Sequence, residues 1–270
     1  MSEIKVWTQW SDLNAPSGIT LLSPENFPLD SSDLSQIDFY VPTYMTGAKG
    51  LSYVEKMTNL KVLQMPNAGY EDALAHLRPG LTLCNATGVH DASTAELAVG
   101  LAIASRRGFA EFMKDQNDGI WNHRRFPSLS DSKVGIVGFG SIGKEIAKKL
   151  SVFDVEVTAF TQSGRDGSLK VDELDKHLPN LDIVILILPL TDTSRHMFDA
   201  ARLSKMKDGA LLINVARGRH LVEQDLLDAL AAGHMAGATL DVFREEPLPQ
   251  GHAFWTHPQI TVTPHTSART

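Results

Sequence analysis

The stretch Val134–Leu150, VGIVGFGSIGKEIAKKL, decides the fold of this chain. It opens with the short apolar run Val134–Val137 and continues with the glycine-rich segment GFGSIG. The residues after the first glycines are apolar at every fourth position, namely Ile142, Ile146 and Leu150. A bounded apolar run is typical of a buried strand, and a fourfold spacing is typical of one face of a helix. The stretch is therefore predicted to form a strand, a tight glycine turn and a helix.

The glycine turn has the pattern G-x-G-x-x-G, formed by Gly138, Gly140 and Gly143. The first glycine allows a tight turn, the second lets the backbone approach a pyrophosphate, and the third lets helix and strand pack closely. The helix begins at Ser141 and Ile142, whose free N–H groups would face the phosphates. Three glycines in a turn can also be purely structural. The strand before them and the helix after them are the context that a dinucleotide site requires, so we predict such a site here.

Short apolar runs alternate with amphipathic stretches on both sides of this motif. After it, strands are predicted at Val155–Phe160, Ile183–Leu188, Ala210–Val215, Ala238–Val242 and Ile260–Thr263, with a helix at Glu223–Ala232. Before it, strands are predicted at Lys5–Trp7, Ile37–Val41, Lys61–Gln64 and Leu81–Cys84, with a helix over Asp91–Arg106 that Ser93 or Thr94 can cap. This alternation predicts an α/β fold in which the second part is a doubly wound parallel sheet.

Composition narrows the class of protein. The 270 residues, 43% of them hydrophobic and 21% charged, are enough for two small domains. A formal net charge of −7 argues against nucleic acid or a membrane as the main partner. The one cysteine, Cys84, excludes an internal disulfide and is predicted to be a small buried hydrophobe. With no signal peptide in the first residues and no apolar run longer than Ile183–Leu188, we expect a cytoplasmic protein, and we assign no metal ligands.

The residues after the strand Val155–Phe160 should meet the adenosine ribose of a dinucleotide. An NAD enzyme normally carries a carboxylate there, but this chain has Thr161, Gln162, Ser163 and Arg165, with no acidic residue before Asp166. Neutral donors and an arginine can hold a 2′-phosphate. The alternative is a solvated loop in which the arginine has no role. The chemistry favours NADP(H) over NAD(H).

Three polar residues follow the last predicted strands, at the sheet edge where such folds bind ligands. They are Arg217 in NVARGR, Glu246 in DVFREEP and His265 in TVTPHTS. Each alone has an ordinary alternative, since an arginine after a strand is usually a surface ion pair and a lone histidine is usually structural. Together they predict an acid, an electrostatic group and an anchor in one site.

The segments GIVGFGSIG, LPLTDTS, LLINVARG, LDVFREEPLP and TVTPH, in this order, resemble the D-isomer-specific 2-hydroxyacid dehydrogenase family. The resemblance runs from Asp91 to the end of the chain and is nearest to the glyoxylate and hydroxypyruvate reductase branch. It implies a Rossmann-type NAD(P)-binding domain over residues 91–265 and a smaller, flavodoxin-like α/β substrate domain over residues 1–90. Residues 266–270 would begin the segment that returns to the first domain, and the family's terminal helix does not follow them.

The resemblance also implies a role for each polar residue at the sheet edge. Arg217 would grip the substrate carboxylate and polarise its 2-oxo group, which the planar guanidinium suits. His265 would protonate the oxygen as hydride arrives at C2. Glu246 would orient that histidine and favour its charged form.

Four further positions take binding roles from the same resemblance. Asp241 would hold the nicotinamide carboxamide, and Pro189 would lie along the adenosine side of the cofactor. The backbone amides of Ala68 and Gly69, in the segment QMPNAGYED, would complete the carboxylate site.

The implied function is hydride transfer between NAD(P)H and a small 2-oxo acid or D-2-hydroxy acid, glyoxylate-like or hydroxypyruvate-like, in a homodimer. One alternative is a dinucleotide-sensing, corepressor-like binding protein on the same fold, which long tails or a peptide groove would favour. Another is a relative that acts on formate or phosphite.

Overall fold

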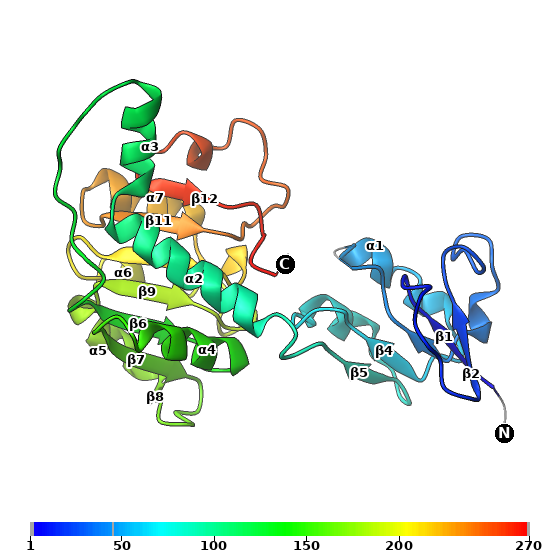
Figure 1. Ribbon diagram of the computed structural model, residues 1–270. Coiled ribbons are helices and arrows are strands. Elements are labelled where there is room, and N and C mark those ends of the chain that lie inside the picture. Colours follow the sequence, from blue (N-terminus) through cyan, green and yellow to red (C-terminus); the bar gives the residue numbers. More distant parts are fainter. Residues whose placement is uncertain (1–2, 45, 269–270) are drawn as a thin grey trace. The chain divides into compact units, whose positions relative to one another are not determined.

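The computed structural model of the chain describes residues 3–44 and 46–268. It divides into two compact units, Met1–Val89 and His90–Thr270, and each unit is built around its own parallel sheet (Figure 1). Among the described residues, no helix is long and apolar enough to cross a bilayer.

The first unit contains a five-stranded parallel sheet in the order β2-β1-β3-β4-β5. Its strands are β1 (Ile4–Trp7), β2 (Ile19–Leu22), β3 (Phe39–Tyr40), β4 (Val62–Gln64) and β5 (Thr82–Cys84). Its helices are the short α1 (Ala48–Leu51) and the 3-10 turns Leu34–Gln36, Val54–Lys56 and Glu71–His76. This strand order is that of a flavodoxin-like fold, which confirms the predicted class.

The core of the first unit packs on this sheet around Trp7, Tyr40 and Leu63. Strand β2 was not predicted, because only its last residue, Leu22, is buried and its sequence shows no alternation. Cys84 is half-buried at the end of β5, not fully buried as predicted.

The second unit contains a seven-stranded parallel sheet in the order β12-β11-β10-β9-β6-β7-β8. Its strands are β6 (Lys133–Val137), β7 (Glu156–Thr161), β8 (Leu169–Lys170), β9 (Ile183–Leu186), β10 (Leu211–Asn214), β11 (Gly237–Leu240) and β12 (Ile260–Val262). Strand order reverses between β6 and β9, the arrangement of a doubly wound Rossmann sheet. The predicted fold class is confirmed.

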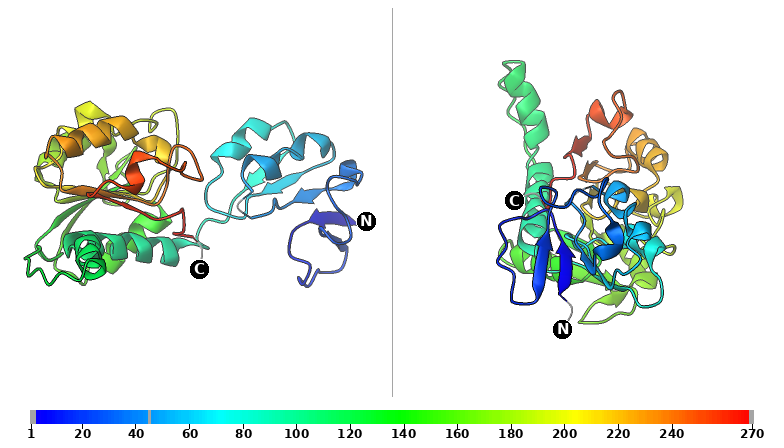
Figure 2. Two further views of the ribbon diagram at one scale, coloured as in Figure 1. Left: turned by 90° about the horizontal axis from the view of Figure 1, so that it is seen from above. Right: turned by 90° about the vertical axis from the view of Figure 1, so that its right-hand side faces the viewer.

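Helices cover both faces of this sheet (Figure 2). They are α2 (Asp91–Arg106), α4 (Ser141–Leu150), α5 (Leu174–His177), α6 (Ala200–Leu203) and α7 (Glu223–Ala231). A further helix, α3 (Phe109–Asn117), follows α2 and belongs to neither core layer. One core layer joins α2 and α4 to the sheet, and the other joins α5, α6 and α7 to it. Since both faces are covered, the central strands β9 and β10 are buried at every position, which is why β9 and the first three residues of β10 are continuous apolar runs.

Two details of the helices differ from the sequence prediction. The structure has no side-chain cap at the N-terminus of α2, where His90 is the capping residue. The hydroxyl of Ser93 donates to the His90 carbonyl, and that of Thr94 to the Ser267 carbonyl. The predicted cap was therefore wrong. Helix α3 was not predicted, although Phe109, Phe112 and Met113 have the spacing of one helix face; the structure buries none of its residues.

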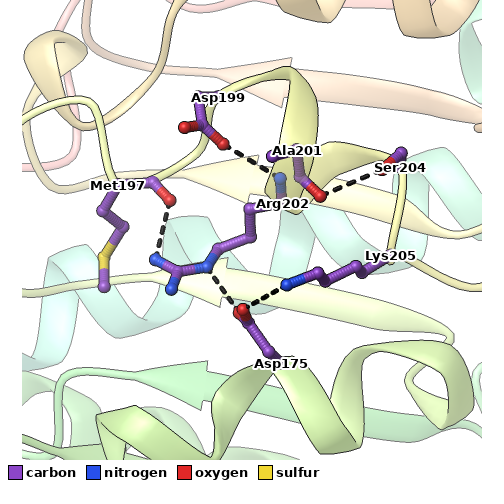
Figure 3. A network of polar contacts seen from close by, with 7 residues as sticks. All are labelled: Asp175, Met197, Asp199, Ala201, Arg202, Ser204 and Lys205. Carbon is purple, nitrogen blue, oxygen red and sulfur yellow. Dashed lines mark hydrogen bonds and ion pairs between the residues drawn. The ribbon is translucent and has the colours of Figure 1, made fainter.

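A polar network ties α5 to α6 on one face of the sheet (Figure 3). The Asp175 carboxylate accepts from Arg202 Nε at 2.7 Å and pairs with Lys205 Nζ at 2.6 Å. Arg202 also donates to the carbonyl of Met197, and Asp199 caps α6 by accepting from the Arg202 amide. The network fixes the helix that precedes β10, the strand that leads to Arg217.

Candidate active site

The glycine turn follows β6, at the point where strand order reverses. Gly138 has φ +106°, and a Cβ there would lie 2.1 Å from the carbonyl oxygen of Ile187. A Cβ at Gly143 would lie 2.2 Å from the carbonyl oxygen of Gly138, whereas nothing lies within 4 Å of one at Gly140. Packing therefore requires the first and third glycines. Gly140 instead faces open space at the N-terminus of α4. Because this space adjoins free backbone amides, the turn fits a dinucleotide pyrophosphate.

The side chains at the start of α4 take part in packing within the second unit. Ser141 Oγ donates to Asp91 Oδ1 at 3.1 Å and so joins α4 to α2. Ile142 is half-buried against the core layer beneath these two helices. Contact of their amides with a cofactor stays a prediction.

The loop after β7 closes on itself through Thr161. The Thr161 hydroxyl accepts from the amides of Gly164 and Arg165 at 2.9 and 3.3 Å, and it shares a hydrogen bond with Ser168 Oγ at 2.8 Å. Thr161 thus shapes the loop that presents the other three predicted selector residues.

Gln162, Ser163 and Arg165 are exposed on this loop. The neighbouring Asp166 pairs with Lys144 of α4 at 2.9 Å, and this ammonium lowers the pKa of Asp166 below its usual value. Within the described residues, the Arg165 guanidinium makes no hydrogen bond or ion pair of its own. The acid next to Arg165 is therefore held by a lysine.

Arg217 follows β10 in an extended conformation and is half-buried. Its Nη1 donates to the carbonyl of Ala216 at 2.7 Å. The buried Asn214 secures the loop, because its Nδ2 donates to the Arg217 carbonyl at 2.9 Å and its Oδ1 accepts from the Ala216 amide at 3.1 Å. Asn214 was not predicted from the sequence; its signal was a polar residue at the end of an otherwise apolar strand.

His265 and Glu246 meet directly, with Nδ1 and Oε2 2.6 Å apart. Their side chains are 30% and 35% exposed, so the pair faces solvent only in part. A carboxylate only accepts hydrogen bonds, so Nδ1 carries the proton and Nε2 is the nitrogen left to exchange one. The second carboxylate oxygen accepts from the Phe243 amide at 2.9 Å.

The surroundings of this pair lower the pKa of Glu246. Burial of Glu246 would raise its pKa, but hydrogen bonds from His265 and the Phe243 amide outweigh that effect, and the charges of His265 and Arg217 add to them. The net result is a pKa of Glu246 below its usual value. Of the three residues that the sequence proposed at the edge of β10, β11 and β12, Arg217 and His265 thus both act on the carboxylate of Glu246.

Asp241, just after β11, is fully buried. Its carboxylate accepts hydrogen bonds from Thr263, Thr266 and Ser267, all on the segment that carries His265. The contact of Asp241 with a nicotinamide carboxamide stays a prediction. The bonds in the structure attach Asp241 to the segment that carries His265.

Pro189 follows β9 and is exposed. Its carbonyl oxygen accepts from Ser194 Oγ at 3.0 Å and lies 3.3 Å from His220 Nε2. These contacts shape the segment after β9. The predicted place of Pro189 beside the adenosine of the cofactor stays a prediction.

Ala68 and Gly69 belong to the first unit, in the loop after β4. Asn85 Nδ2 donates to the Ala68 carbonyl at 2.8 Å, which anchors the loop. Within the part of the chain that the structure describes, neither the Ala68 nor the Gly69 amide donates to an acceptor. Two such amides can receive an anion.

The model of the D-isomer specific 2-hydroxyacid dehydrogenase NAD-binding domain matches residues 99–267, more than half of the chain. The chain belongs to this family. The family's NAD-binding domain covers both the glycine turn and the Arg217, Glu246 and His265 cluster.

Known relatives agree with this assignment. Glyoxylate/hydroxypyruvate reductase A of Photorhabdus laumondii is 37% identical over 180 residues, which are 65% of this chain and 58% of that protein. The mitochondrial formate dehydrogenase of Solanum tuberosum is 32% identical over 243 residues, which are 85% of this chain and 62% of that protein. The chain therefore spans less than two thirds of the length of these curated relatives.

A solved structure matches both units. It is the NADPH-dependent glyoxylate/hydroxypyruvate reductase of Sinorhizobium meliloti, in complex with NADP and sulfate. This chain is 26% identical to it, with a TM-score of 0.85, and the match covers 98% of this chain and 89% of that one.

Proposed function

We propose that this family member reduces small 2-oxo acids to D-2-hydroxy acids with a nicotinamide cofactor. The observation that carries the proposal is the His265–Glu246 pair, whose Nδ1 and Oε2 atoms are 2.6 Å apart. The positive charge of Arg217 acts on the same carboxylate, and the unit also contains the glycine turn at Gly138. A proton donor, its carboxylate partner and an arginine anchor are the groups that reduction of a carbonyl beside a carboxylate needs.

Each residue of the cluster has one task in this proposal. Arg217 binds the substrate carboxylate and polarises the 2-oxo group with its planar fork. His265 gives the proton on Nε2 to the carbonyl oxygen, and Glu246 holds the imidazole by Nδ1 and stabilises its charge. The bound cofactor supplies the hydride that C2 receives.

The first unit is proposed as the substrate domain, with the amides of Ala68 and Gly69 completing the carboxylate site. Their lack of acceptors in the described residues supports this role. The Gly138 turn and α4 are proposed to hold the pyrophosphate, and Pro189 to line the adenosine side.

NADP(H) is proposed as the preferred cofactor. The support is an exposed Arg165 on the loop after β7, with Asp166 drawn to Lys144 and no acidic residue among Thr161, Gln162 and Ser163. The Sinorhizobium meliloti relative is described as NADPH-dependent.

A homodimer is proposed from the surface of α3 and the loop after it. Helix α3 buries none of its residues, and its apolar side chains Phe109 and Met113 are exposed. The following loop exposes Ile120 and, at 97%, Trp121. Apolar side chains gathered in this way favour a second copy as the covering partner. The single cysteine supports a reducing, cytoplasmic compartment.

The test is a substrate panel of glyoxylate, hydroxypyruvate, pyruvate and bulkier 2-oxo acids, each followed by loss of NADPH or NADH absorbance. Formate and phosphite with NAD⁺ or NADP⁺ form the opposite arm. We expect turnover of the small 2-oxo acids and none of formate or phosphite. Cofactor binding without turnover of any 2-oxo acid would contradict the proposal and favour a sensing protein.

A further inference from the structure

The segment Thr263–Ser267 carries His265 in a backbone conformation that residues other than glycine seldom adopt. The φ angle of His265 is +48°, in the left-handed region. Such a conformation persists only where the surroundings hold it. The local turn contributes one bond, from the His265 amide to the Thr263 carbonyl at 3.0 Å.

The Thr263 amide donates to the Leu240 carbonyl at 3.0 Å, and three further bonds from the segment converge on the Asp241 carboxylate. Its Oδ1 accepts from Thr263 Oγ1 at 2.6 Å and from the Thr266 amide at 2.9 Å, and its Oδ2 accepts from the Ser267 amide at 3.0 Å. The three donors lie on both sides of His265 in the sequence. One carboxylate therefore fixes the backbone before and after the imidazole.

Asp241 is fully buried, and a buried carboxylate is tolerated only where donors satisfy it. Its three bonds all go to this one segment, and Ser267 is itself buried. The Thr94 hydroxyl of α2 donates to the Ser267 carbonyl at 3.4 Å and adds a second attachment. Asp241 exposes no surface, so these donors surround its carboxylate.

We propose that Asp241 is a positioning residue, which holds the left-handed backbone of His265 and thereby sets the imidazole against Glu246. The inference rests on the proposed function only in taking His265 as the proton donor. It differs from the role that the family resemblance implies, contact with the nicotinamide carboxamide. The two roles separate experimentally, because one acts on the proton donor and the other on cofactor binding.

The first test is Asp241→Asn. The amide keeps the shape but replaces one oxygen by an NH₂ donor, which faces another donor whichever way the group is turned. We expect kcat to fall by about 10–100-fold, with the KM of the 2-oxo acid and the Kd of NADPH within about twofold of the wild type. A Kd for NADPH raised about tenfold or more, with kcat retained, would overturn the positioning role in favour of the carboxamide contact.

A second pair of variants covers the case in which Asp241→Asn does not fold. Thr263→Val removes the donor at nearly constant shape, and Thr263→Ser keeps it. We expect a loss in kcat of about 3–10-fold for the valine variant and activity near that of the wild type for the serine variant. Equal kcat values in the two variants would count against the proposal.

A readout without turnover separates this proposal from the proposed function. In the NMR spectrum, the amides of Thr266 and Ser267 and the Nδ1 proton of His265 should lose their exchange protection in Asp241→Asn and in Thr263→Val. If these signals change while the wild type reduces no 2-oxo acid, the positioning role stands and the proposed function fails. If the wild type is active while the signals and kcat stay unchanged in both variants, the positioning role fails.

Discussion

The backbone of Gly218 lies directly against the backbone of Phe243. A Cβ on Gly218 would be 1.9 Å from the Phe243 carbonyl carbon and 2.1 Å from its oxygen. Gly218 follows Arg217, and the Phe243 amide donates to Glu246. The contact therefore brings the arginine segment and the glutamate segment together, and only glycine permits it.

Gly218→Ala should push these two segments apart. We expect a loss of unfolding free energy of about 1–3 kcal/mol and a fall in kcat/KM, because backbone cannot yield as a flexible side chain can. Gly100→Ala is the matched control, since Gly100 lies in α2 and nothing is within 4 Å of its Cβ position. That variant should be neutral or more stable by about 0.5–1 kcal/mol. Thermal unfolding and steady-state kinetics measure both, and an unaffected Gly218→Ala would contradict the contact.

Arg217→Lys should keep the fold and lose much of the activity. A point charge cannot hold the carboxylate and the 2-oxo oxygen in one plane. Two charge-assisted hydrogen bonds of about 1.5–3 kcal/mol each imply a loss in kcat/KM of roughly 10²-fold or more. The exposed Arg219 offers the control Arg219→Lys, which should stay near the wild type. Near-normal kcat/KM for Arg217→Lys would remove the anchoring role.

Glu246→Gln should narrow the pH range of reduction from its alkaline side. The imidazolium and the carboxylate stabilise each other's charge at 2.6 Å, and reduction needs the protonated imidazole. Glutamine cannot supply the negative charge that stabilises the imidazolium, so we expect the alkaline limb of kcat/KM to move down. The pH profile of the exposed neighbour variant, Glu245→Gln, should match the wild type. An identical profile in Glu246→Gln would exclude the pairing from the chemistry.

Asp182→Asn should destabilise the second unit in a pH-dependent way. Burial would raise the pKa of Asp182, but bonds from the Lys133 amide at 2.8 Å and Lys207 Nζ at 2.6 Å lower it overall. A carboxyl with a lowered pKa stabilises the fold above its ordinary pKa and loses that effect as pH falls through the folded-state value. We expect a loss of about 1–3 kcal/mol at neutral pH that shrinks below about pH 4.

Denaturant unfolding of Asp182→Asn at several pH values measures this effect. The control is Asp172→Asn, since Asp172 is exposed, and a change within about 0.5 kcal/mol at every pH is expected there. A loss for Asp182→Asn that is the same at pH 3 and pH 7 would show that the charge is not responsible.

Arg165→Ala should lower kcat/KM for NADPH and leave NADH unaffected. A charge-assisted hydrogen bond to a 2′-phosphate, worth about 1.5–3 kcal/mol, corresponds to a preference of roughly 10–150-fold. The absence of an acidic residue at Thr161 or Gln162 removes the repulsion that would favour NADH. NADH serves as the internal control in the same variant. Equal or better use of NADH by the wild type would falsify the cofactor assignment.

Local sequence determined the elements and the order in which they follow one another. The glycine turn at Gly138, the helix Asp91–Arg106 and the strands around Ile183 and Leu211 carry their own signals, because apolar spacing and glycine conformations act over a few residues. The same signals, with the segments around Arg217, Glu246 and His265, were enough to place the chain in its family. Strand β2, which buries only Leu22, gave no comparable signal.

Only the tertiary structure decided which groups meet. The Nδ1 of His265 contacts Glu246 across 19 residues of sequence, Asp241 holds the segment around His265, and Lys144 pairs with Asp166, the neighbour of Arg165. Each of these contacts joins the end of one strand to another element, and its length depends on how the strands align in the sheet. Spacing along the chain does not encode that alignment. It arises when both faces of the sheet are packed. This is why the sequence, with the family resemblance, named the site residues and the pairing of Glu246 with His265, but not the bonds that Asp241 and Lys144 make.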